Sequence, residues 1–295
     1  MRKTHRPVMD TSAKVLACTL NAAPSMTDRK GAASHAAHGR TSTANTTSGH
    51  LHKVHRDEHL QATISHFDEL SAQYDHYALK RQDYLGAVDH IILDQIGRRS
   101  PCSYLDVGCG TGRLLAKIQH AFPASHGFGI DVSSQMVETC RAKGLDVAQA
   151  DFFAFQPTTP FDVVFLEFNV FGYLIVQNGL SDTIRHLRRL VGDRGAIVFD
   201  ILNPLCLTYA RLRQTLPTAV ERCCNLLIKG GEAQFTYSVG GNPITMGLAW
   251  SGRIESSFRE AGYTVQRHSI KYADHRWLKP LPRLLTSQFL FVVSR

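Results

Sequence analysis

Short apolar segments alternate with segments of helical periodicity between residues 103 and 202, and this alternation restricts the fold more than any other feature. Several of the apolar segments have strand length and no polar face, as in a parallel sheet covered by helices on both sides. The chain therefore predicts an α/β fold with a doubly wound, mostly parallel sheet. The predicted strands are SYLDV, HGFGI, LDVAQA, FDVVFLEF and GAIVFDIL, and the helices between them are TGRLLAKIQHAF, SSQMVETCRAKG and SDTIRHLRRLV.

The segments on either side predict additions to this sheet. Apolar residues recur at helical spacing from residue 57 to residue 96, which indicates an N-terminal helical cap of two helices. Residues 205–250 contain a helical segment, LCLTYARLRQTL, and then EAQFTYSV and ITMGLAW on either side of GGNP, which predicts a small inserted hairpin. A further helix and strand, SGRIESSFREAGYTV, and a last strand, SQFLFVV, complete the domain.

Residues 1–56 differ from the rest in composition. They are rich in Ser, Thr, Ala, Gly and His without apolar periodicity, so we predict a disordered basic leader before one domain over residues 57–295. Residues 1–55 hold eight Lys or Arg and two Asp, and so carry six of the eight net positive charges. Because nucleic-acid-binding domains carry a basic face in the body itself, this distribution argues against a nucleic-acid partner. Either Met1 or Met26 can be the true start.

The seven cysteines are odd in number and include no CxxC pair. This pattern indicates reduced thiols in a cytoplasmic protein, with neither a disulfide framework nor a metal site. Low-complexity composition explains His50, His52 and His55 better than metal binding, since no acid or cysteine surrounds them. No segment approaches the roughly 18 apolar residues that span a bilayer. The N-terminus lacks the apolar region of a secretory signal, although an organellar transit peptide stays an alternative.

A glycine turn follows the first predicted strand. In LDVGCGTG, Asp106 precedes Gly108, Gly110 and Gly112, which occupy alternate positions. Glycine permits unusual backbone dihedral angles and lets a ligand lie directly on the chain. The helix that follows favours negative charge at its N-terminus, and ligands of doubly wound sheets bind beyond the carboxyl ends of the strands. The turn therefore predicts a site for a nucleotide-like ligand.

Two classes of ligand compete for this turn. A dinucleotide uses the spacing GxGxxG, whereas the spacing here is GxGxG, and Asp106 would repel a pyrophosphate. S-adenosyl-L-methionine instead carries an ammonium group that suits this carboxylate. Asp131 ends the second strand, where it can accept hydrogen bonds from ribose hydroxyls, and Asp151 follows the third, at the height of an adenine amino group. Each acid alone could be a turn residue, but together with the glycines they favour S-adenosyl-L-methionine.

With these pieces in place, the sequence resembles the class I S-adenosylmethionine-dependent methyltransferases, in particular their small-molecule members. The matching segments run in the family's order over about residues 60–203, from LDVGCGTGRLL and GIDVSSQMVETCRAKG to LRRLVGDRGAIVFDILNP. The resemblance implies a Rossmann-like fold and S-adenosyl-L-methionine as cofactor. The cofactor-binding residues that it implies are Tyr74, Asp106, Gly108, Cys109, Gly110, Gly112, Asp131, Val132, Met136, Asp151, Phe152, Phe168 and Asn169.

Some of these residues have equally simple structural interpretations. Tyr74 resembles a tyrosine with which the family's N-terminal helix closes over the cofactor, but it can also be a core aromatic. Asn169 can be a turn residue after the fourth strand, and Cys109 a small filler within the glycine turn. These alternatives predict packing without ligand contact.

Methyl transfer from a sulfonium is an in-line displacement, so we expect the protein mainly to align the reactants. A base is needed only if the acceptor must lose a proton; His268, His275 and Tyr237 are candidates, but a structural role is more common for such residues, and no catalytic residue is assigned. The segment EFNVFG lacks the Asn-Pro-Pro-aromatic motif of the adenine-methylating branch. We therefore expect a small-molecule acceptor, methylated on an O, N or C atom.

The insert at residues 205–250 is predicted to cover the acceptor pocket. Its apolar residues would line that pocket or form the insert's own small core; they are Phe235, Tyr237, Met246 and Trp250. Three other functions stay open: an NAD(P)-dependent oxidoreductase, a non-catalytic cofactor-binding module, and an RNA methyltransferase guided by the leader. The sequence predicts neither the acceptor nor the oligomeric state.

Overall fold

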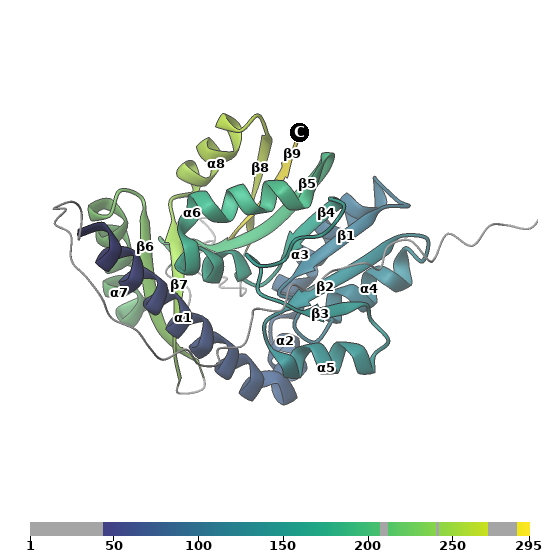
Figure 1. The fold of residues 1–295 in the computed structure, drawn as a ribbon, viewed down its shortest axis with the longest axis horizontal. Helices are drawn as coiled ribbons and strands as arrows, with labels where there is room; N and C mark the ends of the chain where they lie inside the picture. The colour runs from purple at the N-terminus through teal and green to yellow at the C-terminus, as the bar shows by residue number, and fades with distance from the viewer. Residues whose placement is uncertain (1–43, 207–211, 240–241, 271–287) are drawn as a thin grey trace, which may run out of the picture.

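The computed structural model describes residues 44–206, 212–239, 242–270 and 288–295. Seven strands form one sheet in the order β3-β2-β1-β4-β5-β9-β8 (Figure 1). The pairs from β3 to β5 are parallel, and β9 runs antiparallel to both of its neighbours. The predicted α/β fold with a mostly parallel sheet is therefore confirmed. The strands are β1 Ser103–Val107, β2 His126–Asp131, β3 Val147–Gln149, β4 Phe161–Leu166, β5 Val191–Leu202, β8 Thr264–Ile270 and β9 Gln288–Ser294.

Helices cover both faces of this sheet, and each face has its own apolar core. Alternate residues of β4 belong to different cores. Val164 and Leu166 lie in the cluster under α6 and α8. Val163 and Phe165 lie in the cluster under α3, α4 and α5. Neighbouring strand residues point to opposite faces, which explains why these strands carry no polar side. The covering helices are α3 Gln82–Gly97, α4 Arg113–Ala121, α5 Ser134–Ala142, α6 Val170–Leu190 and α8 Ser251–Glu260.

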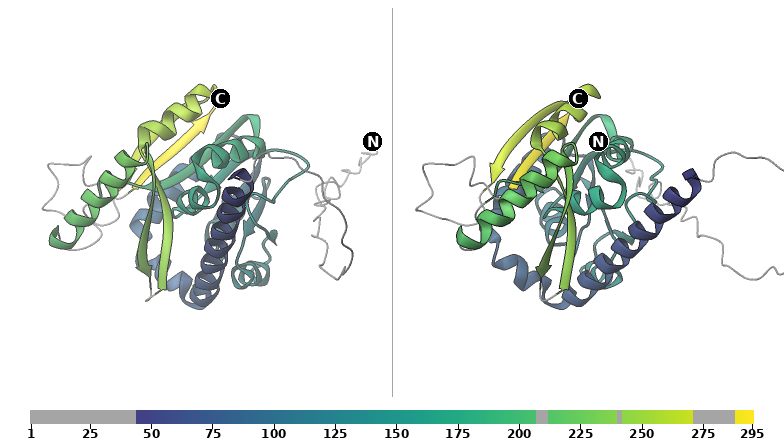
Figure 2. Two further views of the ribbon diagram at one scale, coloured as in Figure 1. Left: turned by 60° about the vertical axis from the view of Figure 1, so that its left-hand side comes forward. Right: turned by 90° about the vertical axis from the view of Figure 1, so that its left-hand side faces the viewer.

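The N-terminal cap differs from the predicted pair of helices. It consists of α1 Ala44–Leu70, a 3-10 turn Ser71–Gln73 and α2 Tyr74–Leu79, followed directly by α3. Helix α1 begins at Ala44, within the segment predicted as a disordered leader over residues 1–56; the leader residues before it lie outside the described part of the chain. Periodicity missed this start because the first turns of α1 have no apolar stripe to signal them. The helix runs from the inserted hairpin towards α5 (Figures 1 and 2).

The insert contains the predicted hairpin, β6 Glu232–Val239 paired antiparallel with β7 Asn242–Ala249. It forms a two-stranded sheet of its own beside the main sheet (Figure 2). The helix of the insert, α7 Leu212–Ile228, begins later than the segment predicted for it, whose central residues lie outside the described ranges. Helix α6 breaks at Gly179 (φ 76°, ψ 170°). Directly after the break, Leu180 N donates a hydrogen bond to Glu232 Oε2 over 3.0 Å, and this bond ties the hairpin to α6.

The described helices do not resemble membrane spans. None of them combines the length and the apolar character that crossing a bilayer requires.

Candidate cofactor site

The glycine turn between β1 and α4 has the backbone geometry that its sequence predicts. Gly108, Gly110 and Gly112 all have left-handed φ angles, of 73°, 54° and 76°. A Cβ atom would also clash at two of them, 2.7 Å from Val170 Cγ2 at Gly108 and 2.3 Å from Leu145 Cδ1 at Gly112. Glycine is therefore required here both for conformation and for space.

Tyr74 lies over this turn. A Cβ atom on Gly110 would be 3.3 Å from Tyr74 Cε1, so the ring rests directly on the glycine backbone. Two aspartates of the cap fix this position: Thr111 Oγ1 donates to Asp75 Oδ1 over 2.5 Å, and Ser133 Oγ donates to Asp68 Oδ1 over 2.5 Å. The cap is thus pinned to the starts of both α4 and α5, on either side of the turn.

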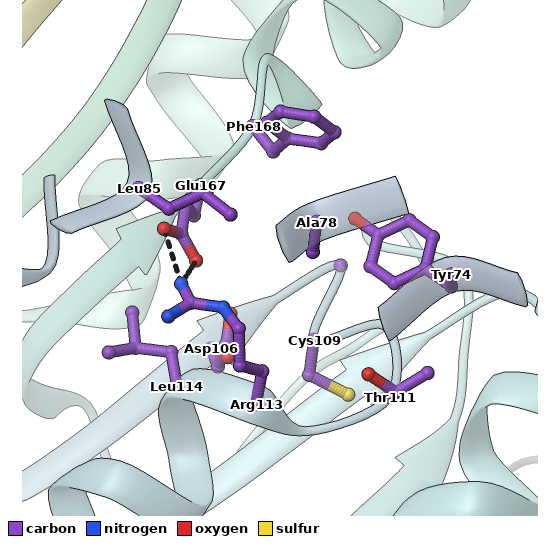
Figure 3. Close-up of a pocket in the computed structure, with 11 residues that line it drawn as sticks. Tyr74, Ala78, Leu85, Asp106, Cys109, Thr111, Arg113, Leu114, Glu167 and Phe168 are labelled. Atoms are coloured by element: carbon purple, nitrogen blue, oxygen red, sulfur yellow. Dashed lines mark hydrogen bonds and ion pairs between the residues drawn. The ribbon is translucent and has the colours of Figure 1, made fainter. Parts of the chain in front are cut away.

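A pocket of about 390 Å³, counting its open mouth, lies between the turn, the end of β4 and the cap (Figure 3). Five predicted site residues line it: Tyr74, Asp106, Gly108, Cys109 and Phe168. The other residues of its wall are Ala78, Leu85, Thr111, Arg113, Leu114 and Glu167.

Asp106 contributes a buried carboxylate to this pocket. The residue is 3% exposed, and among the described residues no hydrogen bond to its carboxylate is formed. Burial raises its pKa to about 8, and the nearby carboxylates of Asp131 and Asp89 add to the shift while Arg113 opposes it. An ionised carboxylate that is buried without a partner costs free energy, so this position favours a ligand that brings a cation or hydrogen-bond donors.

Asp131 and Asp151 hold turns of the chain and do not line the pocket. Asp131 accepts hydrogen bonds from Gly110 N and Ser133 N, each over 2.9 Å, and so fixes the glycine turn from behind. Asp151 Oδ1 accepts from Phe153 N over 2.9 Å and Ala154 N over 3.1 Å. Of the three predicted acids, the structure therefore brings only Asp106 into this pocket.

The residues predicted around the adenine are mostly packed in the core. Met136 is 1% exposed on the first turn of α5, and Phe152 is 3% exposed. The Phe152 ring packs edge-on against His186, with 4.6 Å between centroids. Val132 offers its carbonyl oxygen to Gln149 Nε2 over 3.2 Å. These contacts show how the residues are held, and the side chains shape the strand ends without facing the pocket beside Asp106.

The turn after β4 is strained and anchored from below. Phe168 and Asn169 have φ angles of 67° and 65°, which are uncommon for residues with a side chain. Asp200 Oδ1 accepts from Asn169 N over 2.8 Å. Asn169 Oδ1 in turn accepts from Leu202 N over 3.0 Å, and its Nδ2 donates to Met246 Sδ over 2.7 Å. The Asn169 side chain is therefore used within the protein, as in the turn interpretation, and only Phe168 faces the pocket.

Sequence reasoning missed Asp200, although a lone acid in the apolar strand IVFDIL was a readable signal. This residue is fully buried and accepts a hydrogen bond from the Tyr84 hydroxyl on its other oxygen. Burial raises its pKa to about 6, and the hydrogen bonds from Tyr84 and Asn169 limit the shift. It therefore supports the turn that carries Phe168.

A charged network beside the pocket was also missed. Arg113, the first residue of α4, donates to both oxygens of Asp89 over 2.8 and 2.7 Å and to both oxygens of Glu167 over 2.7 Å (Figure 3 shows the second pair). Lys117 Nζ lies 2.7 Å from Asp89 Oδ2. The sequence shows Arg113 directly after the glycines and Glu167 directly after β4. No residue near Asp89 in the sequence indicates that Asp89 is their partner.

No catalytic base emerges from the predicted candidates. His268 is exposed on β8, at the edge of the sheet, and does not line the pocket. Tyr237 pairs with Ile244 within the hairpin, and His275 lies outside the described ranges. Within those ranges, no group of His, Cys, Asp and Glu is arranged to hold a metal ion.

The apolar residues of the insert pack mainly on one another. Met246 belongs to a cluster with Tyr173, Leu226 and Leu248, and the side chains of Phe235 and Trp250 pack against it. This arrangement matches the interpretation of a small core within the insert.

Comparisons with known proteins agree with this architecture. Residues 105–197 match the model of a family described as a methyltransferase domain. Malonyl-acyl-carrier protein O-methyltransferase 2 of Ilyobacter polytropus is 28% identical over 155 residues, which is 51% of this chain and 56% of that protein. Trans-aconitate 2-methyltransferase of Rhodococcus jostii is 33% identical over 82 residues, 28% of this chain and 32% of that protein. The chain thus spans about half of the length of these relatives or less.

A solved structure from Listeria monocytogenes, provisionally named an S-adenosylmethionine dependent methyltransferase, has the same fold. It covers 72% of this chain and 98% of its own, with a TM-score of 0.54 and 17% sequence identity. The antiparallel β9 between β5 and β8 also separates this sheet from the parallel 3-2-1-4-5-6 order of dinucleotide-binding folds. Residues 105–197 therefore match a methyltransferase domain, and the chain as a whole has the fold of the S-adenosylmethionine-dependent methyltransferases.

Proposed function

We propose that this protein transfers a methyl group from S-adenosyl-L-methionine to a small-molecule acceptor by in-line displacement. The observation that carries the proposal is Asp106, a buried carboxylate without a hydrogen-bond partner among the described residues, on the wall of a pocket floored by a glycine turn. A cofactor with an ammonium group supplies the missing partner, and at Gly108 the backbone itself forms part of the pocket wall, so the cofactor can lie directly on the chain. The residues present therefore fit this cofactor.

In this proposal the cofactor extends from the pocket along the strand ends. The glycine turn and Asp106 hold the methionine end, and Asp131 accepts hydrogen bonds from the ribose. Two hydrogen bonds support this role of Asp131, because Gly110 N donates to one carboxylate oxygen and Ser133 N to the other and together they fix its orientation. A carboxylate has about four lone-pair sites, so acceptor sites remain for the ribose hydroxyls. Asp151 is proposed to read the adenine, in the region of Val132, Met136 and Phe152.

The bound cofactor supplies an activated methyl group on sulfur, so the chain's own residues mainly position and shield the reactants. Tyr74 and Phe168 stand on two sides of the pocket, with 6.4 Å between their ring centroids. We infer that these rings exclude water from the transfer. The buried Asp200 and Asn169 maintain the strained turn that presents Phe168.

The insert at residues 205–250 is proposed to form the acceptor side of the domain over residues 57–295. The hairpin supports this because Asn169 Nδ2 bonds to Met246 Sδ, so β7 sits against the turn that borders the pocket. The two curated relatives are named for malonyl and trans-aconitate acceptors. A carboxylic acid is therefore the first class of acceptor to test.

The setting of the reaction is proposed to be the cytoplasm. In the described ranges, free thiols are carried by Cys102, Cys109, Cys140, Cys223 and Cys224, and the first three of these are buried. Such a set suits a reducing compartment.

Calorimetry with purified protein tests the cofactor. S-adenosylhomocysteine should bind, and Asp131→Ala should weaken that binding at least tenfold, whereas Asp182→Ala, at an exposed i,i+3 pair with Arg185, should not. Unchanged affinity in Asp131→Ala would remove Asp131 from the site. Binding of NADPH in place of S-adenosylhomocysteine would favour the oxidoreductase alternative.

A labelled methyl donor tests the reaction. Transfer of label to a small acid, identified by mass spectrometry of extract metabolites, is the expected result. Cofactor binding without transfer to any metabolite would point to the non-catalytic module, and transfer to RNA by the full chain would point to the RNA methyltransferase.

A further inference from the structure

Helix α7 of the insert has two apolar sides, and one of them holds it on the hairpin. On this inner face, Ala219 and Leu226 are buried, and Leu226 packs in one cluster with Leu248 of β7. Arg222 is buried on the same face, with its guanidinium carbon 5.1 Å from the centroid of the Phe235 ring. A helix on the surface of a domain needs only one such face.

The opposite side of α7 exposes a second row of apolar side chains. Val220 is 54% exposed, Leu227 is 72% exposed and Ile228 is 81% exposed. The exposed thiol of Cys224 lies in the same row. These four residues have the spacing i, i+4, i+7 and i+8, which places side chains on one side of a helix. We call this row the outer face of α7, which runs along the edge of the molecule (Figure 2).

The outer face differs from the other exposed apolar residues in the described ranges. The large apolar side chains exposed elsewhere in those ranges are Leu79 on α2 and Leu205 after β5, which come from different elements. Apolar residues exposed singly are normal and need no explanation, whereas a contiguous exposed row typically marks an interaction site. The outer face therefore calls for a partner.

Two charged residues indicate which partner fits. Glu221 lies near the start of the outer face and Lys229 just beyond its end, and both are exposed. Eight residues of helix separate them by about 12 Å along the axis. A second α7 that runs in the opposite direction places its own Lys229 near Glu221, and its own Glu221 near Lys229. The face is thus complementary to itself, which is the property that a two-fold interface requires.

The apolar residues of the row match each other in the same arrangement. Val220 and Ile228 lie four residues before and four residues after Cys224. A two-fold axis that passes beside Cys224 therefore brings Val220 of each copy against Ile228 of the other. Leu227 then lies opposite the aliphatic part of Glu221, and the two Cys224 side chains meet at the axis.

We propose that the outer face of α7 is the interface of a two-fold dimer, in which α7 pairs antiparallel with α7 of a second copy of this chain. The small side chain of Cys224 at the axis lets the two helices approach to about 8 Å, the lower end of the usual range. The face is short, so the pairing is weak and depends on protein concentration. Because the inner face of α7 packs on the hairpin, the pairing also supports the insert. This inference is independent of the proposed cofactor.

Sedimentation equilibrium of the full chain tests the dimer. Over a series from about 1 μM to about 100 μM, the wild-type protein should pass from monomer to dimer. Leu227→Glu and Ile228→Glu should each raise the dissociation constant at least tenfold, because the dimer would bury an unpaired charge. Leu79→Glu is the matched control, since it makes the same change at an exposed leucine away from α7. It should change the dissociation constant less than twofold.

Exchange of the two charges tests the antiparallel arrangement. Glu221→Lys and Lys229→Glu should each weaken the dimer at least threefold, because each variant places like charges at both ends of the pair. The double variant re-forms both ion pairs with their signs exchanged, so its dissociation constant should return to within twofold of the wild type. A dimer that the double variant does not restore would overturn the proposed pairing.

A thiol-specific oxidant tests the position of the axis. Diamide takes one hydrogen atom from each of two thiols and is reduced to a hydrazine, while one S–S bond forms between the two sulfurs. The wild-type protein should give a covalent dimer on a non-reducing gel, and Cys224→Ser should not. Cys223→Ser is the matched control one position round the helix, where the side chain is half-buried, and should still give the covalent dimer.

Three further results would overturn the proposal. A monomer at every concentration would do so, and if its Cys224 also failed to react with an alkylating reagent, another segment of the same chain would be the cover of the outer face. A dimer that Leu227→Glu and Ile228→Glu leave intact would place the interface elsewhere. None of these results bears on the cofactor, which calorimetry tests separately.

Discussion

The two sides of the pocket are fixed by different means. On the β1–α4 side, the backbone itself sets the geometry, through three left-handed glycines and a hydrogen bond from Gly110 N to Asp131. On the side of the cap and the insert, side chains far apart in the sequence set it, through contacts such as Asp68 with Ser133 and Asn169 with Met246. The first side is a local structure that one sequence segment encodes, whereas the second depends on the completed fold.

The largest loss of stability is expected from a substitution in the glycine turn, on the β1–α4 side of the pocket. Gly112→Ala places a Cβ 2.3 Å from Leu145 Cδ1 and 2.9 Å from Cys140 Sγ at a φ of 76°. Left-handed strain of about 1–2 kcal/mol and overpacking of about 1–3 kcal/mol should together lower the free energy of unfolding by about 3–4 kcal/mol. Urea unfolding measures this loss.

Gly144→Ala is the matched control for this experiment. Its φ of 73° is nearly the same, but a Cβ there would meet nothing within 4 Å. Only the strain of about 1–2 kcal/mol should appear. Equal losses in the two variants would show that the clash at Gly112 relaxes at no cost.

Asp106, on the β1–α4 side of the pocket, should make the free energy of unfolding depend on pH. Burial raises its pKa to about 8, against about 3.9 in an unfolded chain. The folded protein therefore binds more protons between these values, and its free energy of unfolding falls as pH rises through the interval. We expect a loss of about 2–3 kcal/mol between pH 5 and pH 8, at up to about 1.4 kcal/mol per unit.

The comparison of Asp106→Asn with the wild type isolates this contribution. The amide does not titrate, so the pH dependence of urea unfolding should become flatter in the variant. A slope identical to that of the wild type would mean that other groups dominate, such as Asp200, whose pKa burial raises to about 6.

A smaller effect is expected where the second side meets the main domain. Asn169→Ala removes the acceptor of Leu202 N and the donor to Met246 Sδ. A buried backbone N–H without a partner costs about 1–3 kcal/mol, so the free energy of unfolding should fall by about 2 kcal/mol. Hydrogen exchange should show faster exchange at Leu202 than in the wild type, with β1 unaffected; uniform acceleration would indicate that the turn supports the whole sheet.

The smallest effect is expected at the pins of the cap. Asp75→Asn weakens the contacts with Thr111 and Lys143, and the Asp75 side chain is 59% exposed. Exposed ion pairs contribute only about 0–1 kcal/mol, so global stability should barely change. Hydrogen exchange across residues 68–80 should nevertheless become several-fold faster, because the cap loses one of its two pins. Unchanged exchange there would show that the Asp68–Ser133 contact and the packing of the Tyr74 ring hold the cap without the Asp75 contacts.

The division between local and distant determinants explains what the sequence predicted. The strand alternation, the glycine turn and the placement of Asp106 were readable because the signal lies within a few neighbouring residues. The network of Asp89, Arg113 and Glu167 was not, since α3, α4 and the end of β4 meet only in the folded sheet.

The predicted trio of acids illustrates the same limit within the site. Asp131 and Asp151 were placed correctly at strand ends, but the backbone N–H groups that orient their carboxylates could not be deduced from spacing. The start of α1 at Ala44 was also not predictable, because its first turns have no apolar periodicity. The role of Asn169 as an internal tie depends on its contact with Leu202, which is distant in the sequence.

The break in α6 at Gly179 has a consequence for how this protein could diversify. The first half of the helix contacts the hairpin, since a Cβ on Gly247 would lie 2.5 Å from Ile175 Cγ2. Both halves pack on the main sheet, the first through Phe171, whose ring stacks on Phe199, and the second through Leu180, Ile184 and Leu187. Glu232 caps the second half at the joint. The hairpin therefore meets α6 on both sides of Gly179, so a hairpin of new shape must be accommodated by both halves of the helix.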